Sequence, residues 1–503
     1  MSTESQRPII VAGAGPTGLT LATELRRGGA EVLLLDRRAN RDVDGSRAAG
    51  MQPRTVEMLD QRGIAERFLA VGPPRDLGNF AGIRLDYTRL PSRHPGAYNI
   101  MQSETEELLE AVAAELGVQV RWSTEVTGLR QDADGVEVTV DGPDGPETLC
   151  GSYLVGCDGG RSTVRKLSGV GFPGTAARMV CLIGDVALAE PPRQPMFLER
   201  FEGGLFTVIQ FRPGWYRVVT TERERAAGPG DPVTLDELRA STLRVAGTDF
   251  GMHSPTWLSH FNDANRQADR YRVGRVLLAG DAAHIHLPAG GQGMNMGMQD
   301  AFNLGWKLAA VVRGDAPDAL LDTYHDERHA ADAETLKLIR AQSTLVQPDP
   351  MLGDLVDVLT DLVGFGDVNT YFSAKLSGLD LRYPMPGDHP LLGRRVPDAD
   401  ISSTAGDERI FDLLVTARPV LLGFSNTAQL TAVATGWADR IDIVTADRAI
   451  ESWDVPGVGT IPAPSALLIR PDGYVAWVSD SDPDLAALQR ALGRWCGRAL
   501  HHA

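Results

Sequence analysis

The stretch IIVAGAGPTG, residues 9–18, determines how the first part of the chain folds. Its apolar residues predict a buried strand over 8–12, and the pattern that follows predicts a helix over 17–27 and a second buried strand over 31–35. A strand, a Gly-x-Gly-x-x-Gly turn and a helix, in that order, are the context of a dinucleotide-binding fingerprint. The glycines permit a tight turn and a close backbone approach, and free N–H groups at the helix start can bind a pyrophosphate. The candidate contacts are Gly13, Gly15, Thr17 and Gly18.

An acidic residue ends the second predicted strand. Asp36 lies 18 residues after Gly18, and its carboxylate can accept hydrogen bonds from a ribose hydroxyl. A carboxylate in this place suits FAD or NAD, whereas a 2′-phosphate would be repelled. Arg37 and Arg38 permit the opposite interpretation, as ligands of an NADP phosphate. The fingerprint by itself does not distinguish between these dinucleotides.

Two later motifs repeat the pattern of an aspartate after a buried strand. They are CDGGRSTVR at residues 157–165 and GRVLLAGDAAH at 274–284, the second followed by GGQGMN at 290–295. Asp158 and Asp281 thereby reach the carboxyl ends of strands, where α/β sheets bind their ligands. The Gly-rich loop after Asp281 leads into a predicted helix whose N-terminus can stabilise negative charge. The alternative is that each aspartate only caps a helix.

Taken together, these three motifs resemble the group A flavoprotein aromatic hydroxylases, the para-hydroxybenzoate hydroxylase and phenol hydroxylase superfamily. The segments RQADRY at 266–271 and LLGRRVPD at 391–398 resemble its actinobacterial polyketide and antibiotic monooxygenases, such as those for anhydrotetracycline, angucyclines and rifampicin. The resemblance implies FAD as cofactor, NAD(P)H (NADPH favoured) as reductant and O₂ as co-substrate. It further implies hydroxylation of a polycyclic aromatic, polyketide-type phenol through a flavin C4a-hydroperoxide.

The resemblance also assigns roles to residues. It implies that Asp36 contacts the adenosine ribose, Asp281 and Gln102 the flavin ribitol region, and Arg47 the flavin as a catalytic, flavin-positioning residue. Asp158 and Arg165 belong to a motif implicated in FAD and NADPH binding. The full set of implied cofactor contacts is Gly13, Gly15, Thr17, Gly18, Asp36, Arg37, Arg47, Gln102, Asp158, Arg165, Asp281, Pro288, Gly291, Gly293, Met294 and Asn295. No metal site is expected.

The fold class that follows is α/β plus α+β. A Rossmann-like FAD-binding domain is expected over residues 1–75, 100–178 and 272–390. The strand-rich pattern from 179 to 221 predicts an inserted antiparallel sheet, so that residues 76–99 and 179–271 form a substrate-binding domain. Residues 391–503 are expected to form a compact α/β domain, which resembles the thioredoxin-like domain of phenol hydroxylase but lacks a redox Cys-x-x-Cys pair.

Several elements are predicted from periodicity and turn residues. A hairpin joins 136–140 to 149–154 around the turn at 142–145, and a Pro/Gly-rich linker runs from 383 to 397. Helices are predicted over 105–115, 300–313, 320–341 and 485–495, and strands over 118–122, 275–279, 419–424, 441–445, 466–470 and 474–479.

Some side chains permit more than one interpretation. Phe197, Phe206 and Trp215, in the predicted inserted sheet, either line a substrate pocket or belong to an ordinary core. His284 and His286 are either a metal pair or, with stronger reason in a flavin loop, neighbours that position it. His325 and His329 are spaced like part of a metal motif, but the order of the intervening residues favours a solvated helix face.

Composition excludes several classes of function. A formal net charge of −17 without a basic block argues against a nucleic-acid partner. The N-terminal segment lacks the apolar region of a secretory signal, no apolar run is long enough for a membrane span, and the cysteines lack disulfide or metal spacing. We therefore expect a cytoplasmic monomer or homodimer. The alternatives are Baeyer–Villiger oxidation or oxidative inactivation of an antibiotic by the same chemistry, and a non-catalytic FAD-fold binding protein.

Overall fold

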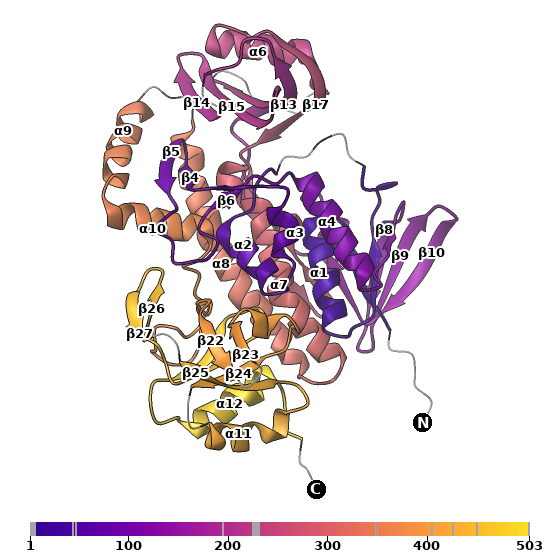
Figure 1. Ribbon diagram of the computed structural model, residues 1–503. Coiled ribbons are helices and arrows are strands. Elements are labelled where there is room, and N and C mark those ends of the chain that lie inside the picture. The colour runs from indigo at the N-terminus through magenta and orange to yellow at the C-terminus, as the bar shows by residue number, and fades with distance from the viewer. Residues whose placement is uncertain are drawn as a thin grey trace.

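The computed structural model describes residues 7–42, 45, 48–193, 196–223, 232–347, 349, 351–403, 406–424, 427–448 and 451–500. Figure 1 shows a central domain of helices and a parallel sheet, an antiparallel sheet above it and a C-terminal α/β domain below it. We call the upper sheet the insert sheet. The chain leaves the central domain for the insert sheet and returns to it before it enters the C-terminal domain.

The central sheet has the strand order β19-β20-β11-β1-β2-β7. Strand β1 lies between β2 and β11 and pairs in parallel with both, and β11 pairs in parallel with β20. The strands are β1 (Ile9–Ala12), β2 (Val32–Leu35), β7 (Val120–Arg121), β11 (Tyr153–Gly156), β19 (Arg272–Val273) and β20 (Val276–Leu278). The predicted βαβ unit at the N-terminus is therefore confirmed, and the strands that precede the three motifs are neighbours.

Helices cover the central sheet. They are α1 (Pro16–Arg27), α2 (Pro53–Asp60), α3 (Ala65–Leu69), α4 (Gln102–Glu115), α5 (Thr163–Leu167), α7 (Gln292–Val312) and α8 (Asp322–Leu345). Helices α1 and α7 approach closely, since a Cβ atom on Gly305 would lie 2.5 Å from Cβ of Glu24. The predictions of α4, α7 and α8 are confirmed in kind. Helix α7 begins eight residues before its predicted start at 300, directly in the Gly-rich loop.

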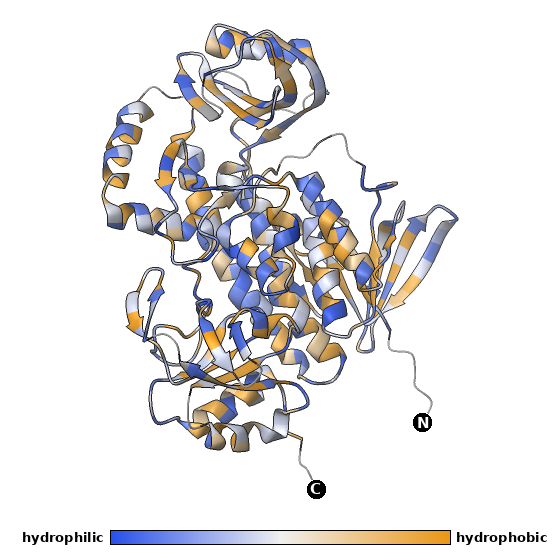
Figure 2. Cartoon of the chain, in the orientation of Figure 1, coloured by the Kyte–Doolittle hydropathy of each residue, from blue (hydrophilic) through white to orange (hydrophobic). Residues whose placement is uncertain are grey.

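The predicted hairpin is correct in place but not in extent. Strand β9 (Val136–Gly142) pairs with β10 (Gly145–Gly151) across the predicted turn, and β8 (Glu125–Gln131) flanks β9. The predicted second strand, 149–154, is divided at Ser152, so that its last residues belong to β11 of the central sheet. Burial alternates along β9, and Figure 2 shows the corresponding alternation of hydrophobic and hydrophilic residues.

The insert sheet is antiparallel, with the order β14-β15-β16-β13-β17. Its strands are β13 (Val180–Leu188), β14 (Met196–Phe201), β15 (Gly204–Arg212), β16 (Trp215–Glu222) and β17 (Met252–Asn262), and helix α6 (Leu235–Ala246) covers one face. The opposite face meets the central domain, because Cys181 and Leu205 share a hydrophobic core with Leu336 and Ile339 of α8. The predicted inserted sheet is confirmed.

A further layer of short elements joins the insert sheet to the central domain. Hairpin β4–β5 packs against α9 and α10. These two helices were not predicted from the sequence. The elements are β3 (Pro74–Arg75), β4 (Leu77–Phe80), β5 (Ile83–Asp86), β6 (Ala97–Tyr98), α9 (Leu352–Val363) and α10 (Gly366–Ser377). Short pairings around the Asp281 loop add β12 (Gly174–Thr175), β18 (Asn265–Gln267) and β21 (His284–Ile285).

The C-terminal domain has a mixed sheet with the order β23-β22-β25-β24-β28-β29. Strands β24 and β25 are parallel, and β28 and β29 are antiparallel to their neighbours. The elements are β22 (Asp400–Ser403), β23 (Gly406–Arg409), β24 (Val420–Phe424), α11 (Ala428–Ala434), β25 (Asp442–Arg448), β26 (Ser452–Val455), β27 (Gly459–Pro462), β28 (Ala466–Ile469), β29 (Val475–Ser479) and α12 (Leu485–Trp495). The strands predicted here are confirmed within a few residues, and helix 485–495 is confirmed in full.

The segment predicted as a linker, 383–397, is not a free connection. Tyr383, Leu391 and Val396 are buried, and the last two belong to the core of the C-terminal domain. Its Pro and Gly residues set turns, but its apolar residues pack between the two domains.

Candidate functional site

In the dinucleotide loop, Gly13 and Gly18 have no room for a Cβ atom, whereas Gly15 faces open space. Gly13 has a φ of +106°, and a Cβ there would lie 2.2 Å from the carbonyl oxygen of Cys157. A Cβ on Gly18 would lie 1.8 Å from the carbonyl oxygen of Gly13. A Cβ on Gly15 would meet no atom within 4 Å. The loop therefore holds its turn by close packing and leaves space in front of the N-terminus of α1, as a pyrophosphate requires.

Asp36 is nearly buried and both of its carboxylate oxygens are occupied. It accepts hydrogen bonds from the backbone N–H of Ala14, at 2.7 Å, and from the backbone and guanidinium of Arg38. Arg38 also pairs with Glu106, at 3.0 Å, and Glu106 accepts a bond from the amide of Gln102 at 2.8 Å. The structure thus links predicted residues Asp36 and Gln102 through Arg38 and Glu106, while Arg37 is exposed.

Glu106 was missed by the sequence reading. The helix was predicted to begin at residue 105, after Gln102, so nothing in the prediction placed the two side chains on one helix face. Helix α4 begins at Gln102, which places Glu106 one turn away on the same face. Burial opposes the charge of Arg38, but its hydrogen bond to Asp36 and the charge of Glu106 together raise its pKa. With its guanidinium bound to two carboxylates, Arg38 does not present itself to a 2′-phosphate.

Asp158 caps helix α5. Its carboxylate accepts hydrogen bonds from the hydroxyl of Ser162 and from the backbone N–H groups of Thr163 and Val164. Asp158 therefore has the helix-capping role that its sequence motif left open as an alternative. Arg165 donates to the carbonyls of Gly160 and Ala282, and its guanidinium lies 3.7 Å from the ring centroid of Phe172. Arg165 therefore ties the second motif to the loop that follows Asp281.

Asp281 differs from the other two aspartates because its side chain is exposed. Within the described residues its carboxylate forms no hydrogen bond or ion pair. It lies at the start of α7, since a Cβ on Gly293 would be 4.0 Å from its Oδ1 and 3.4 Å from Nε2 of His286. An exposed carboxylate beside a helix N-terminus is available to accept hydrogen bonds from a polyol.

The first turn of α7 is shaped by Gly291 and Asn295. Gly291 has a φ of +64°, and a Cβ on it would meet nothing within 4 Å. Asn295 is fully buried; it donates to the carbonyls of Gly50 and Gly291 and accepts from the backbone N–H of Gln52. It thus fastens the loop that follows Arg47. Of the other predicted residues here, Pro288 is exposed and Met294 is buried in the central core.

Thr17 joins the first and third motifs. A Cβ on Gly280 would lie 2.6 Å from its Oγ1, and a Cβ on Gly297 would lie 2.2 Å from the same atom. The N-termini of α1 and α7 therefore converge, each with an open glycine, beside the exposed carboxylate of Asp281. Two helix N-termini of this kind favour an anionic ligand with a ribose or ribitol attached, and FAD fits this donor set.

Of the predicted pocket residues, Phe206 requires a correction. It is fully buried in the core beneath α6 and stacks on Phe250 at 5.0 Å between ring centroids. Its position along β15 turns it away from the central domain, so it is a core residue. Trp215 is half-buried, on the face opposite Tyr216. Arg47 and the side chain of Phe197 lie outside the described residues.

The face of the insert sheet toward the central domain carries a buried ion pair that the sequence reading missed. Arg217 binds Asp185 through two hydrogen bonds of 2.8 Å, and its guanidinium lies 5.4 Å from the ring of Trp257. Trp257 contacts Gly45, since a Cβ on Gly45 would lie 2.2 Å from its Cγ. Gly45 therefore meets this polar part of the sheet.

Comparison with known families agrees with this site. Residues 6–338 match the family described as an FAD binding domain, and residues 389–499 match the C-terminal domain of aromatic-ring hydroxylases. The chain therefore belongs to the FAD-dependent aromatic-ring hydroxylases, and it is a flavin monooxygenase that binds FAD. No helix within the described residues is long and apolar enough to cross a membrane.

Its relatives are similar along their whole length. The chain is 46% identical to 12-dehydrotetracycline 5-monooxygenase/anhydrotetracycline 6-monooxygenase of Streptomyces rimosus, over 97% of this chain and 98% of that one. It is 43% identical to a rifampicin monooxygenase of Streptomyces venezuelae, over 98% and 99%. Among solved structures, the OxyS anhydrotetracycline hydroxylase from Streptomyces rimosus has a TM-score of 0.90 at 44% identity, over 98% and 99%. CabE, an aromatic hydroxylase from angucycline biosynthesis, has a TM-score of 0.91 at 42% identity, over 98% and 100%.

Proposed function

We propose that this monooxygenase uses NADPH and O₂ to hydroxylate a polycyclic aromatic phenol of the polyketide type. The observation that carries the proposal is the convergence of α1 and α7 beside the exposed carboxylate of Asp281. The relatives named for anhydrotetracycline and angucycline biosynthesis support the substrate class.

In this proposal the chain holds FAD at both helix N-termini. The N–H groups beyond Gly15 bind the pyrophosphate, Asp281 accepts hydrogen bonds from the ribitol, and the Gly291 turn lies against the flavin ring. Asp36 can accept a bond from the adenosine ribose once Arg38 shifts, since its acceptor positions are engaged. Bound FAD supplies the activated oxygen. Arg47 and Gln102 retain their expected roles around it. Asp158 and Arg165 act on the cofactor site indirectly, through the cap of α5 and through the carbonyls of Gly160 and Ala282.

The insert sheet supplies the substrate wall. Trp215, Arg217 and Trp257 share its inner face, so a flat aromatic ring can pack on the indoles beside the ion pair of Arg217 and Asp185. The contact between Trp257 and Gly45 closes the site on that side and helps to exclude water.

The remaining parts of the chain are assigned as follows. The domain division is the one expected from the sequence, with a Rossmann-like cofactor domain and a C-terminal domain of thioredoxin-like type. The latter is supported by its parallel β24–β25 pair followed by antiparallel β28 and β29. Cys496 is buried in it, so its role is structural. A cytoplasmic location and a monomeric or homodimeric state complete the proposal.

The function is tested with purified protein and a series of tetracyclic phenols. We expect the protein to show flavin absorbance and NADPH oxidation that a substrate phenol stimulates, with one oxygen atom added to the product mass. Insertion of oxygen into a ring carbon–carbon bond would instead identify a Baeyer–Villiger enzyme. Absence of stimulation by any aromatic substrate would contradict the proposed substrate class.

Asp281→Ala tests the cofactor site. Because Asp281 is exposed and unbonded within the described residues, the variant should keep the stability of the wild type. Its FAD affinity should fall about 10-fold or more, since it loses charge-assisted hydrogen bonds. The matched control is Asp482→Ala, an exposed aspartate in the C-terminal domain. Full retention of FAD in Asp281→Ala would remove Asp281 from the site.

A further inference from the structure

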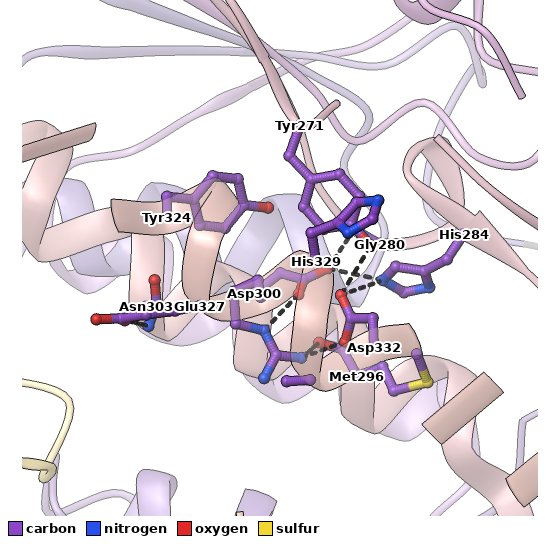
Figure 3. A network of polar contacts seen from close by, with 12 residues as sticks. Tyr271, Gly280, His284, Met296, Asp300, Asn303, Tyr324, Glu327, His329 and Asp332 are labelled. Carbon is purple, nitrogen blue, oxygen red and sulfur yellow. Dashed lines mark hydrogen bonds and ion pairs between the residues drawn. The ribbon is translucent and has the colours of Figure 1, made fainter. Parts of the chain in front are cut away.

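A buried cluster of charged side chains lies beneath the Asp281 loop (Figure 3). Its members are His284 of β21, Asp300 of α7, and Arg328 and Asp332 of α8, all with essentially no exposed surface. Tyr271 closes the cluster, because its hydroxyl donates to Asp332 at 3.0 Å. No step of the proposed reaction uses these residues, although burying four ionisable groups is costly unless each is paired.

The cluster is not a metal site. His284, Asp300 and Asp332 do place ligand-type atoms within 4.8 Å of one another. The guanidinium of Arg328, however, already binds both carboxylates, through Nε to Asp300 at 2.7 Å and through a terminal nitrogen to Asp332 at 2.6 Å. A cation would have to displace this arginine from a fully buried position.

Asp300 connects the cluster to the cofactor loop. Its Oδ2 accepts a hydrogen bond from the backbone N–H of Gly280 at 2.9 Å, and the same oxygen lies 2.8 Å from Nε2 of His284. Gly280 directly precedes Asp281 and has a left-handed φ of +61°. The orientation of the exposed Asp281 carboxylate therefore depends on a turn that Asp300 fastens from below.

With both aspartates ionised, the charges in the cluster balance when His284 is a cation. Burial opposes that charge, but Asp332 and Asp300 outweigh it and raise the pKa of His284 to about 9. Burial likewise opposes the charge of Asp300, but Arg328 and His284 lower its pKa below the usual range. For Asp332, burial prevails and raises the pKa. Loss of the His284 proton at high pH leaves an excess negative charge under the loop.

Other titratable groups face the same imidazole or its partners. Asp281 and His286 lie on its own loop. Burial lowers the pKa of His286. His325 and His329 of α8 pack against the ring of Tyr271. Tyr383, which follows α10, accepts a hydrogen bond from Arg328. None of these groups supplies a second cation within hydrogen-bond reach of Asp300, so His284 and Arg328 together neutralise the two aspartates.

We propose that Asp300 is a positioning residue for FAD binding, which fixes the Gly280–Asp281 turn through the Gly280 N–H and holds His284 beneath it as a cation. The inference rests on the proposed contact between Asp281 and FAD. Its consequence is that FAD affinity is highest while His284 is protonated. As pH rises through the pKa of His284, the stabilisation of the turn is lost and FAD binds more weakly.

The test compares Asp300→Asn with Asp332→Asn. An amide has an acceptor on one side only, so the side chain that Asp300→Asn introduces cannot serve both Arg328 and the pair of Gly280 and His284. We expect Asp300→Asn to raise the dissociation constant of FAD, measured by fluorescence titration of apoprotein, by about 10-fold or more. Asp332→Asn is the matched comparison, equally buried and without a contact to Gly280. Because it removes one of the two carboxylates that favour the His284 proton, we expect it to move the loss of FAD affinity to lower pH. At about pH 6, where the imidazole is protonated, its dissociation constant should stay within about threefold of the wild type. Urea unfolding of both apoproteins measures the purely structural cost.

A pH series separates positioning from general destabilisation. Between about pH 7 and pH 10 the wild type should lose FAD affinity, whereas His284→Gln should bind about 10-fold more weakly at pH 7 and show no such slope. This variant also carries the test if Asp300→Asn does not fold. Equal effects of the two Asn variants on FAD affinity at about pH 6, or the same pH slope in wild type and His284→Gln, would overturn the inference. Wild-type protein that binds no FAD at all would instead refute the cofactor site itself.

Discussion

Gly13 and Gly15 differ in what surrounds the position of a Cβ atom, and this gives opposite expectations for Ala substitutions. A methyl group on Gly15 meets nothing within 4 Å and the backbone φ is an ordinary −78°. We expect Gly15→Ala to leave the free energy of unfolding of the apoprotein within about 0.5 kcal/mol of the wild type. The methyl group occupies the space through which a pyrophosphate reaches the N-terminus of α1. The FAD dissociation constant should therefore rise about 10-fold or more.

Gly13→Ala is the matched comparison. A methyl group there overlaps the carbonyl of Cys157, directly after the neighbouring strand β11, and the positive φ adds strain. We expect it to destabilise the apoprotein by more than about 2 kcal/mol, measured by urea unfolding beside FAD titration. If Gly15→Ala lost stability in step with its loss of FAD, the open space in front of α1 would not be a ligand site.

At the residue scale, the sequence predicts the positions of the aspartates better than their partners. Asp36, Asp158 and Asp281 all follow strands, as expected. Only the fold separates them, because Asp36 is saturated by Arg38 and Ala14, Asp158 caps α5, and Asp281 stays exposed. The pairing of Asp300 with Gly280 and Arg328 joins segments from three parts of the chain, and no local pattern predicts such a contact.

At the element scale, the two faces of the insert sheet have different tasks. Phe206 lies in the core beneath α6, and Trp215 lies on the face toward the central domain. We expect Phe206→Leu to lower the free energy of unfolding by about 1–3 kcal/mol while the KM for the aromatic substrate is unchanged. Trp215→Leu should instead raise that KM several-fold with a smaller cost in stability. A KM shift in Phe206→Leu without one in Trp215→Leu would reverse the assignment of the faces.

The elements that the sequence predicts well are those with strong periodicity and definite turns. Strands β1, β2, β24 and β28 and helix α12 are apolar or amphipathic runs between clear breaks. Helix α7 starts earlier than predicted because Gly290 and Gly291 suggested a loop, whereas their left-handed φ values form the turn that opens the helix. Helices α9 and α10 were missed since their packing partner, hairpin β4–β5, lies far away in the sequence.

At the scale of the whole molecule, the C-terminal domain is fastened to the central domain through buried charges. Arg470, before the β28–β29 turn, binds Glu327 of α8 through two hydrogen bonds of 2.6 and 2.9 Å. Glu327 also accepts a bond from Lys307 of α7, at 2.8 Å, and Arg470 lies 4.6 Å from the ring of Trp495. Helices α7 and α8, which frame the cofactor loop, are therefore braced by the C-terminal domain.

The pH dependence of the free energy of unfolding tests the contribution of the buried ion pair between Arg470 and Glu327. Burial alone would raise the pKa of Glu327, but Arg470 and Lys307 outweigh it and lower the pKa from 4.5 to about 2. Because the folded-state pKa is depressed, Glu327 contributes stability that is fully present above about pH 4.5 and is lost as the pH falls toward 2. The difference corresponds to about 3 kcal/mol, as an order of magnitude. Urea unfolding of the wild type between about pH 6 and pH 2.5 should show this loss as part of a steeper decline.

Two glutamine variants on α8 isolate the contribution of the Arg470–Glu327 ion pair. Glu327→Gln cannot be protonated, so its stability should be lower at neutral pH and should fall less steeply in acid than that of the wild type, by about 3 kcal/mol over the same range. Glu334→Gln changes an exposed glutamate on the same helix and should follow the wild-type curve. Because Arg470 and Glu327 join two domains, we also expect the acid loss to affect both domains in one transition, monitored by Trp306 and Trp495 at their boundary. Parallel acid curves for wild type and Glu327→Gln would show that the ion pair is already open in solution and that packing around Trp495 alone holds the domains together.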